Sequence, residues 1–139
     1  MKKTKLLHSE ISYLIARMRH KDRLVIGDAG LPVSNQVQKI DLAVSQGVPD
    51  FLSVLAAVLS EQKIEKVIMA EEFPQLNPEL HQKVIDLLFA MEQEEETELG
   101  VVYIPHETFK EETQKCIGAI RTGEFTSFAN IILISGVVF

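Results

Sequence analysis

The side chains of this 139-residue chain best suited to chemistry near neutral pH are its histidines, together with the aspartates that could orient them. The unperturbed pKa of imidazole is about 6.5, so a histidine can both donate and accept a proton under working conditions. The four histidines are His8, His20, His81 and His106. Their spacing matches no arrangement of zinc ligands. Catalysis by this chain is therefore expected to be general acid–base chemistry by His and Asp, with no metal and no organic cofactor.

Motifs of several other kinds of enzyme are absent. The loop Gly27-Asp28-Ala29-Gly30 lacks the G-x-G-x-x-G dinucleotide fingerprint. The chain has neither a phosphate-binding G-x-x-x-x-G-K-[ST] loop nor a G-x-S-x-G nucleophile elbow. The single cysteine, Cys116, cannot form an internal disulfide, and its place in a helical pattern predicts a buried, inert thiol. These exclusions leave acid–base chemistry in place.

Helical and strand patterns alternate along the chain. Apolar residues at helical spacing predict helices over 9–20, 48–59 and 77–91, with Ser9 and Asn77 as N-caps. A further helix is expected from Thr108 to Ile120, stopped by Gly123. Short apolar runs predict buried strands over 24–26, 63–69, 101–104 and 131–134, while 40–44 stays open. The acidic run 92–98 is expected to be a solvated loop.

This alternation is typical of an α/β fold. The sequence contains no internal repeat, low-complexity segment or linker that would mark a second domain. We predict a single domain over residues 1–139, with a mostly parallel sheet flanked by helices in three layers. The architecture is Rossmann-like without the dinucleotide fingerprint.

Parallel α/β sheets bind ligands outside the carboxyl ends of their strands. That rule selects Asp28 after the first predicted strand and His106 after the third. Glu71 and Glu72 follow the second strand, but adjacent residues of an extended segment point opposite ways, so at most one can enter a crevice. The segment Ser127-Phe128-Ala129-Asn130 lies just ahead of the last strand. The sequence thus puts polar groups at several places where this architecture forms a site.

Each candidate also has a local explanation. Asp28 lies in a glycine-rich turn, where Asp often bonds its own backbone, and Asn130 could be a turn residue as well. His106 could serve only to begin a helix. His20 closes a predicted helix, where the helix dipole favours a cationic imidazole. Residue types alone do not separate these readings.

Composition limits the partners. The chain has 14 Lys and Arg against 20 Asp and Glu, a formal net charge of −6. No nucleic acid and no anionic membrane surface is expected as a partner, because such binding needs clustered cations. The basic start Met1-Lys2-Lys3 is not followed by the apolar core of a signal peptide, and no apolar run is long enough to cross a bilayer. We therefore expect a cytoplasmic protein without membrane insertion.

Short stretches distributed over almost the whole chain resemble the D-ribose pyranase family, sugar-ring mutarotases associated with ribose uptake. Their order and spacing carry the resemblance more than any single piece. The stretches are Met1-Lys2-Lys3, His20, Asp28-Ala29-Gly30-Leu31-Pro32, Ile40-Asp41-Leu42-Ala43, Gln46-Gly47-Val48-Pro49, Ala70-Glu71-Glu72, Asn77-Pro78, Leu80-His81, Arg121-Thr122-Gly123-Glu124, Ala129-Asn130-Ile131-Ile132-Leu133 and Gly136-Val137.

The resemblance implies an isomerase that interconverts the β-pyranose and β-furanose forms of D-ribose. It implies that His20 is the proton donor and that Asp28, His106 and the segment Phe128-Ala129-Asn130 contact the sugar. It also implies a ring-shaped homo-oligomer, commonly a decamer of two pentamers, with sites near subunit boundaries. Whether His20 and His106 of one site come from one chain or two stays open.

Two departures from the family pattern bear on the site. Arg19 precedes His20 where many members have glycine, and Phe128 stands where many have tyrosine. A phenolic hydrogen bond is therefore missing, worth about 1 kcal/mol of binding. The alternatives are a non-catalytic ribose-binding module and a mutarotase for another sugar such as L-fucose. Gly30-Leu31 argues against the latter, because in the fucose mutarotases that resemble this family the corresponding loop reads D-A-H-F-P.

Overall fold

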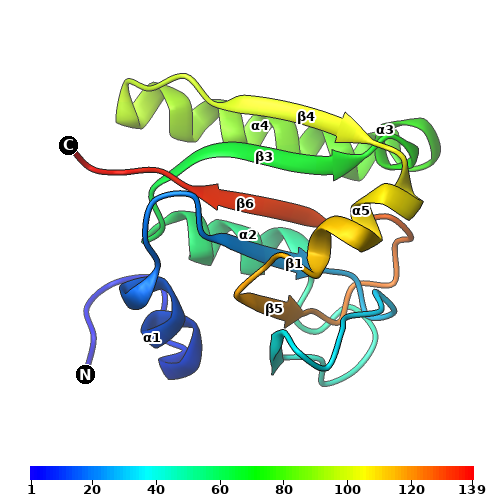
Figure 1. The fold of residues 1–139 in the computed structure, drawn as a ribbon, viewed down its shortest axis with the longest axis horizontal. Coiled ribbons are helices and arrows are strands. Elements are labelled where there is room, and N and C mark those ends of the chain that lie inside the picture. Colours follow the sequence, from blue (N-terminus) through cyan, green and yellow to red (C-terminus); the bar gives the residue numbers. More distant parts are fainter.

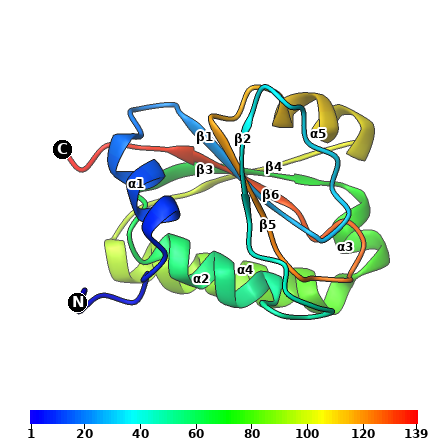
Figure 2. The same cartoon turned by 90° about the horizontal axis from the view of Figure 1, so that it is seen from below.

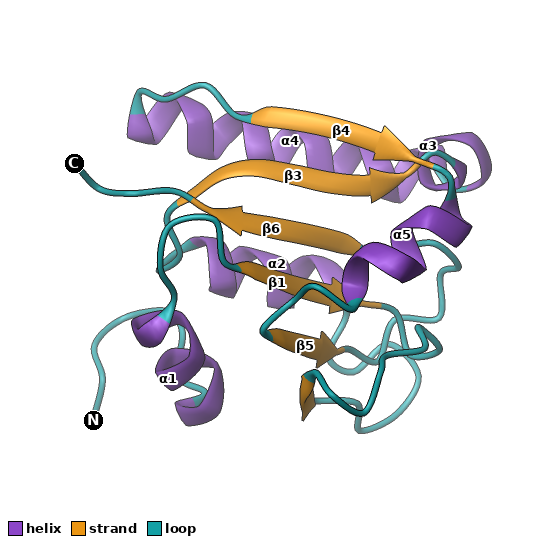
Figure 3. Cartoon of the chain, viewed as in Figure 1, coloured by secondary structure: helices purple, strands orange, loops and turns teal.

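The computed structural model describes all residues, 1–139, and its centre is a six-stranded sheet with the strand order β2-β5-β1-β6-β3-β4. Figures 1 and 3 show the sheet and the helices around it. In chain order the elements are α1 (Ser9–Arg17), β1 (Arg23–Gly27), β2 (Gln38–Asp41), α2 (Phe51–Leu59), β3 (Ile64–Ala70), α3 (Glu72–Leu76), α4 (Pro78–Glu95), β4 (Gly100–Ile104), α5 (His106–Thr113), β5 (Gly118–Arg121) and β6 (Ile131–Ser135).

The sheet is mostly parallel, as predicted. Strand β1 pairs with β5, β5 with β2, and β3 with β4 in parallel, whereas β6 runs antiparallel between β1 and β3. The start of β6 therefore lies at the same edge as the carboxyl ends of the other strands, as Figure 1 shows. This arrangement brings the segment ahead of β6 to the edge where Asp28 and His106 follow their strands.

Helices cover both faces of the sheet, which confirms the predicted three layers. Helices α2 and α4 lie on one face and α5 on the other (Figure 2). Alternate residues of β1 serve the two faces: Leu24 and Ile26 belong to the larger buried cluster, and Val25 to the smaller one. Burial on both sides explains why this strand is an unbroken apolar run. No helix combines the length and the apolar character needed to cross a membrane.

The first helix differs from its prediction at both ends. Its N-cap is His8, not Ser9, because His8 Nδ1 accepts a hydrogen bond from Ile11 N at 3.3 Å. The helix ends at Arg17, so the prediction that His20 closes it is wrong. His20 instead lies in the turn that leads into β1, directly before Lys21 with its left-handed φ of 72°.

The predicted helix over 108–120 is correct only up to Thr113. Helix α5 covers His106–Thr113, and Gly118–Arg121 forms β5 between β1 and β2. The segment is too short to show a strand period, and its pairing partners lie far away in the sequence, so tertiary pairing overrides the local pattern. Cys116 lies between the two elements, is buried as predicted, and burial raises its pKa to about 12.

Two smaller differences concern the third quarter of the chain. The acidic run 92–98 is not all loop, because α4 continues to Glu95, and Glu96, whose φ is 50°, is its C-cap. The short helix α3 was not predicted, and it follows β3 directly. The open segment 40–44 contains the end of β2, which stops at Asp41.

Candidate functional site

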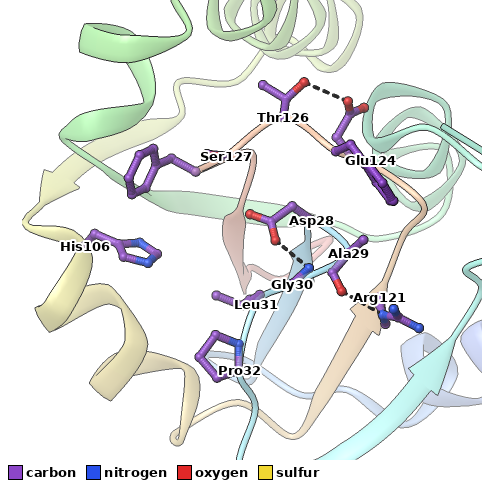
Figure 4. A pocket seen from close by; sticks show the side chains of 12 residues that line it. Asp28, Ala29, Gly30, Leu31, Pro32, His106, Arg121, Glu124, Thr126 and Ser127 are labelled. Atoms are coloured by element: carbon purple, nitrogen blue, oxygen red, sulfur yellow. Dashed lines mark hydrogen bonds between the residues drawn. The ribbon is translucent and has the colours of Figure 1, made fainter. Parts of the chain in front are cut away.

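A pocket of about 560 Å³ opens at the carboxyl edge of the sheet (Figure 4). Its wall is formed by the loop after β1, the start of α5, the end of β5 and the loop ahead of β6. The lining residues are Asp28, Ala29, Gly30, Leu31, Pro32, His106, Arg121, Glu124, Phe125, Thr126, Ser127 and Phe128. Three of the six residues singled out from the sequence, Asp28, His106 and Phe128, thus share one pocket.

Asp28 is held from two directions. Its Oδ1 accepts a hydrogen bond from Gly30 N at 2.8 Å, which is the local turn expected for Asp in such a loop. Its Oδ2 accepts from Asn130 Nδ2 at 3.1 Å, and Asp28 N donates to Asn130 Oδ1 at 2.8 Å. The Asp28 carboxylate therefore stabilises its own turn and also faces the pocket. It is fixed in place and keeps further lone pairs for a ligand.

Asn130 and Ala129 lie behind the wall of the pocket, not on it. Both are completely buried. The amide of Asn130 is engaged by Asp28 on both of its polar atoms, so the residue supports the carboxylate. The close approach needs a glycine nearby: a Cβ on Gly27 would lie 2.7 Å from Leu31 Cδ2 and 3.0 Å from Asn130 Oδ1.

His106 combines the start of a helix with a place on the pocket wall. Its backbone N donates to Glu72 Oε2 at 2.8 Å, so Glu72 satisfies a free amide at the N-terminus of α5. Glu72 itself is not among the residues that line the pocket. The imidazole packs edge-on against Phe128, with ring centres 4.9 Å apart, and stacks on Phe109. Aromatic contacts on two sides fix the orientation of the ring.

The loop ahead of β6 is tied to helices on the α2/α4 face. Asn77 was expected to cap α4, but its side chain makes no cap bond and donates instead to Ser127 O at 2.6 Å. Glu124 Oε1 accepts from Phe51 N at 3.0 Å, and its Oε2 accepts from Thr126 Oγ1 at 2.8 Å. Phe128 itself has a left-handed φ of 66°. The loop is therefore held at several points.

Arg121 is a pocket residue that the sequence analysis missed. Its Nε donates to Ala29 O at 2.9 Å, and its Nη1 donates to both carboxylate oxygens of Asp41, at 3.0 and 3.3 Å. The hydrogen bond from Ala43 N, and then the bond and charge of Arg121, hold the pKa of Asp41 below its ordinary value. Arg121 belongs to a stretch that carried the family resemblance, which was the available signal, but it was expected at the end of a helix.

His20 lies at the opposite end of the sheet from this pocket. Its Nε2 donates to Glu65 Oε2 at 3.0 Å, and its side chain is 49% exposed. Lys21 also pairs with Glu65, and the hydrogen bonds from Lys21 and then His20 lower the pKa of that carboxyl. Strand β1 separates His20 from Asp28, and five strand residues span roughly 16 Å. Within one chain His20 therefore does not reach the pocket.

The surroundings of His20 form a separate, smaller depression of about 440 Å³. Its walls come from the end of α1, the residues before β3 and the segment after β6. Buried Gln62 donates through Nε2 to Ser135 Oγ at 3.0 Å beneath it. The imidazole thus stands at an exposed edge, with Glu65 as its polar contact.

A model of the RbsD / FucU transport protein family matches residues 1–138. The chain belongs to this family. Curated relatives include proteins named D-ribose pyranase from Psychromonas ingrahamii, Yersinia pestis and Aliivibrio fischeri, each 48% identical over the full length of both chains. The family expectation drawn from scattered stretches of the sequence is thereby confirmed.

Two solved structures superpose along the whole chain. The Bacillus subtilis RbsD structure, a complex with D-ribose, has a TM-score of 0.90 and 40% identity with full coverage of both chains. The fucose mutarotase of Streptococcus pneumoniae, solved with L-fucose, has a TM-score of 0.84 at 21% identity, also with full coverage of both chains. The second likeness shows the fold alone. The α/β fold predicted from the sequence is therefore that of the family.

Proposed function

We propose that this protein is a D-ribose pyranase, an isomerase that interconverts the β-pyranose and β-furanose forms of D-ribose. The observation that carries the proposal is the pocket containing Asp28, His106 and Phe128, in a chain 48% identical along its whole length to proteins named D-ribose pyranase. The pocket offers a carboxylate, an imidazole and an apolar ring, which suit the hydroxyls and the apolar face of a sugar.

The reaction needs proton transfer and no cofactor. Opening a hemiacetal ring requires a proton delivered to the ring oxygen and a proton removed from the anomeric hydroxyl, and reclosure through another hydroxyl reverses both transfers. His20 is the proposed donor to the ring oxygen. Asp28 and His106 hold sugar hydroxyls, and Phe128 lies against the sugar, with Ala129 and Asn130 supporting from behind. Factors of about 10²–10⁴ from acid–base catalysis suffice, because the uncatalysed exchange already proceeds in water.

The position of His20 makes the proposed site a shared one. His20 and Asp28 lie at opposite ends of β1, so one chain cannot apply both to one sugar. A second copy that places its exposed His20 at the mouth of the pocket completes the constellation, as in a homo-oligomer with its sites at subunit boundaries. Repeating this head-to-tail contact closes a ring, in agreement with the ring-shaped decamer that the family resemblance implies.

The proposal includes a cytoplasmic location.

Magnetisation transfer in the proton NMR spectrum of equilibrated D-ribose tests the activity. Adding the protein is expected to increase the exchange rate between the pyranose and furanose anomeric signals. Binding of ribose without faster exchange would make the protein a ribose-binding module and contradict the proposal. The same measurement with L-fucose tests sugar preference, and faster exchange of fucose than of ribose would contradict the ribose assignment.

Mixing two impaired variants tests the shared site. His20→Ala and Asp28→Asn chains are each expected to keep only a small residual exchange rate, and co-refolding them at equal amounts should restore about one fully active site in four if copies mix at random. Recovery requires that one chain supplies His20 and another supplies Asp28. A mixture that stays inactive, although mass spectrometry shows mixed oligomers, would place both residues of a site in one chain.

A further inference from the structure

Arg121 and Asp41 form an ion pair between β5 and β2, at the outer part of the sheet. Their side chains are 50% and 58% exposed. Ion pairs this exposed contribute little to folding stability, because water and salt screen them. The contacts of Arg121 beyond Asp41 therefore point to a role outside stability.

Those contacts lead to the loop that carries Asp28. The peptide units on both sides of Ala29 are held by the 121–124 segment: Arg121 Nε donates to Ala29 O at 2.9 Å, and Ala29 N donates to Glu124 O at 2.9 Å. Figure 4 shows the bond between Arg121 and Ala29 beside the bond between Asp28 and Gly30. Ala29 lies between Asp28 and Gly30 in the chain. A shift of Ala29 O therefore alters the turn that orients the Asp28 carboxylate.

Asp28 is thus fixed by one buried and one exposed support. On the buried side Asn130, at the start of β6, pairs with its carboxylate and its backbone N. On the exposed side Arg121 holds Ala29, and Asp41 orients the guanidinium. We propose that Arg121, oriented by Asp41, is a positioning residue that acts through Ala29 to aim the Asp28 carboxylate into the pocket.

The inference rests on the proposed function, because it takes Asp28 to be a ligand contact. A guanidinium suits this task since its planar donors can bind Ala29 O and Asp41 at the same time. A lysine ammonium is a compact point charge on a flexible stem and does not reproduce that fork. The role therefore predicts that arginine is needed here, and not merely a positive charge.

The test is a double-mutant cycle between Arg121→Met and Asp28→Asn, read by the exchange rate of D-ribose. Arg121→Met alone should lower the exchange rate about tenfold, since displacements on the order of 1 Å at a reacting centre have effects of this size or larger. Added to Asp28→Asn, it should change the rate by less than about twofold, because residues that act through one another are not additive. The thermal midpoint of the single variant Arg121→Met should stay within about 2 °C of that of the original protein.

Three further variants sharpen the cycle. Asp41→Asn should lower the rate about two- to threefold, because Asn gives the guanidinium a weaker anchor than the carboxylate. The exchange rate of Arg121→Lys should lie between those of the original protein and Arg121→Met. Lys39→Met is the matched control: it removes a cation of β2 whose ammonium bonds Asn35 and not Ala29, and it should leave the rate unchanged.

Amide hydrogen exchange without any sugar separates this inference from the proposed function. Arg121→Met should speed the exchange of the Ala29 and Gly30 amides while the β1 amides stay protected. That result with no ribose exchange in the original protein would refute the proposed function and keep the loop-holding contact. An unchanged ribose exchange rate in Arg121→Met, or an undiminished loss in the Asp28→Asn background, would overturn the positioning role. Should Arg121→Met not fold, the Asp41→Asn cycle with Asp28→Asn decides by the same criterion.

Discussion

The two ends of the sheet are organised in opposite ways. At the carboxyl edge, Asp28 is held by buried Asn130, and His106 is packed between aromatic rings. At the other end, His20 is half exposed, with its imidazole bonded to Glu65, a carboxylate shared with Lys21. One end is a pocket with firmly held side chains, and the other presents an imidazole outward. On the proposed function, substitutions at the first end should reduce ribose binding, and substitutions at the second should reduce turnover.

The largest expected effect is that of His20→Ala on turnover alone. Loss of the general acid should reduce ribose exchange about 10²- to 10⁴-fold. Binding of ribose should be retained, because the pocket of Asp28 and His106 is intact without His20. Exchange spectroscopy and calorimetric titration of the same sample separate the two quantities.

Arg19→Ala is the matched control for this substitution. Its backbone N bonds Asp22 in the same turn and survives the change, so exchange should stay near the original rate. If His20→Ala abolished ribose binding and turnover together, the division of labour between the two ends would be wrong.

The next largest effect concerns the packing behind the pocket. Gly27→Ala puts a Cβ 2.7 Å from Leu31 Cδ2 and 3.0 Å from Asn130 Oδ1, so the Asp28–Asn130 pair must shift. Overpacking of this kind costs about 1–3 kcal/mol of unfolding free energy. Denaturant titration and ribose titration should show both stability and affinity reduced.

Gly30→Ala tests whether crowding, and not loss of a glycine as such, is the cause. The nearest atom to its added Cβ is Asp28 Oδ1 at 3.6 Å, an ordinary contact. Stability should stay within about 0.5 kcal/mol of the original, as for substitutions without a structural conflict. Equal losses from the two alanines would show that the Asn130 contact is not what Gly27 protects.

The sequence predicted the pocket end better than the other end. Asp28 and His106 follow predicted strands, and the rule for carboxyl ends places them at one edge without knowledge of any contact. The antiparallel course of β6 was not predicted, yet it is what brings Phe128 to that edge. Local pattern and general topology thus sufficed to find Asp28 and His106.

What could not be predicted depends on contacts between distant residues. Asn130 looks like a turn residue locally, and its role becomes visible only through the bond to Asp28, 102 positions away. Arg121 was hidden because β5 is a four-residue strand defined by its neighbours and was taken as helix. His20 is a further case: no contact within one chain connects it to the pocket, so neither sequence pattern nor a single chain's fold explains its position.

A moderate effect is expected at the exposed end from Glu65→Gln. Gln keeps the size of the side chain but removes the charge that accepts the His20 hydrogen bond, so the imidazole is held less firmly. Ribose exchange should fall roughly threefold to tenfold, as for loss of a charge-assisted bond worth about 1 kcal/mol. Ribose affinity should stay unchanged, since Glu65 does not line the pocket.

Lys21→Met is the control for the loss of charge at this end. It removes the other partner of Glu65 and leaves the His20–Glu65 bond in place. Its exchange rate should therefore lie closer to the original than that of Glu65→Gln. A faster rate in Glu65→Gln would mean that the carboxylate restrains His20 from its task.

The smallest expected effect is a pH dependence of the free energy of unfolding that comes from His81, a residue outside the pocket. His81 lies against the edge of Phe73 and shares a hydrogen bond of 2.6 Å with the Tyr103 hydroxyl. It is half-buried, and burial lowers its pKa below the ordinary value near 6.5. The folded chain therefore takes up this proton at a lower pH than the unfolded chain.

The direction of the pH effect follows from that difference. Well above pH 6.5 His81 is neutral in both the folded and the unfolded state, so it adds no pH dependence to the free energy of unfolding. As the pH drops below this value the unfolded chain binds the proton first, so the free energy of unfolding falls. Between pH 7 and 5.5 the thermal midpoint should fall about 1–2 °C more in the original protein than in His81→Phe, a small effect because the side chain is partly solvated. Comparing the two proteins cancels the contributions to pH dependence that they share. Ribose exchange at pH 7 should be the same in both, since His81 does not line the pocket. A reduced exchange rate in His81→Phe would extend the catalytic region beyond the pocket and blur the division between the two ends of the sheet.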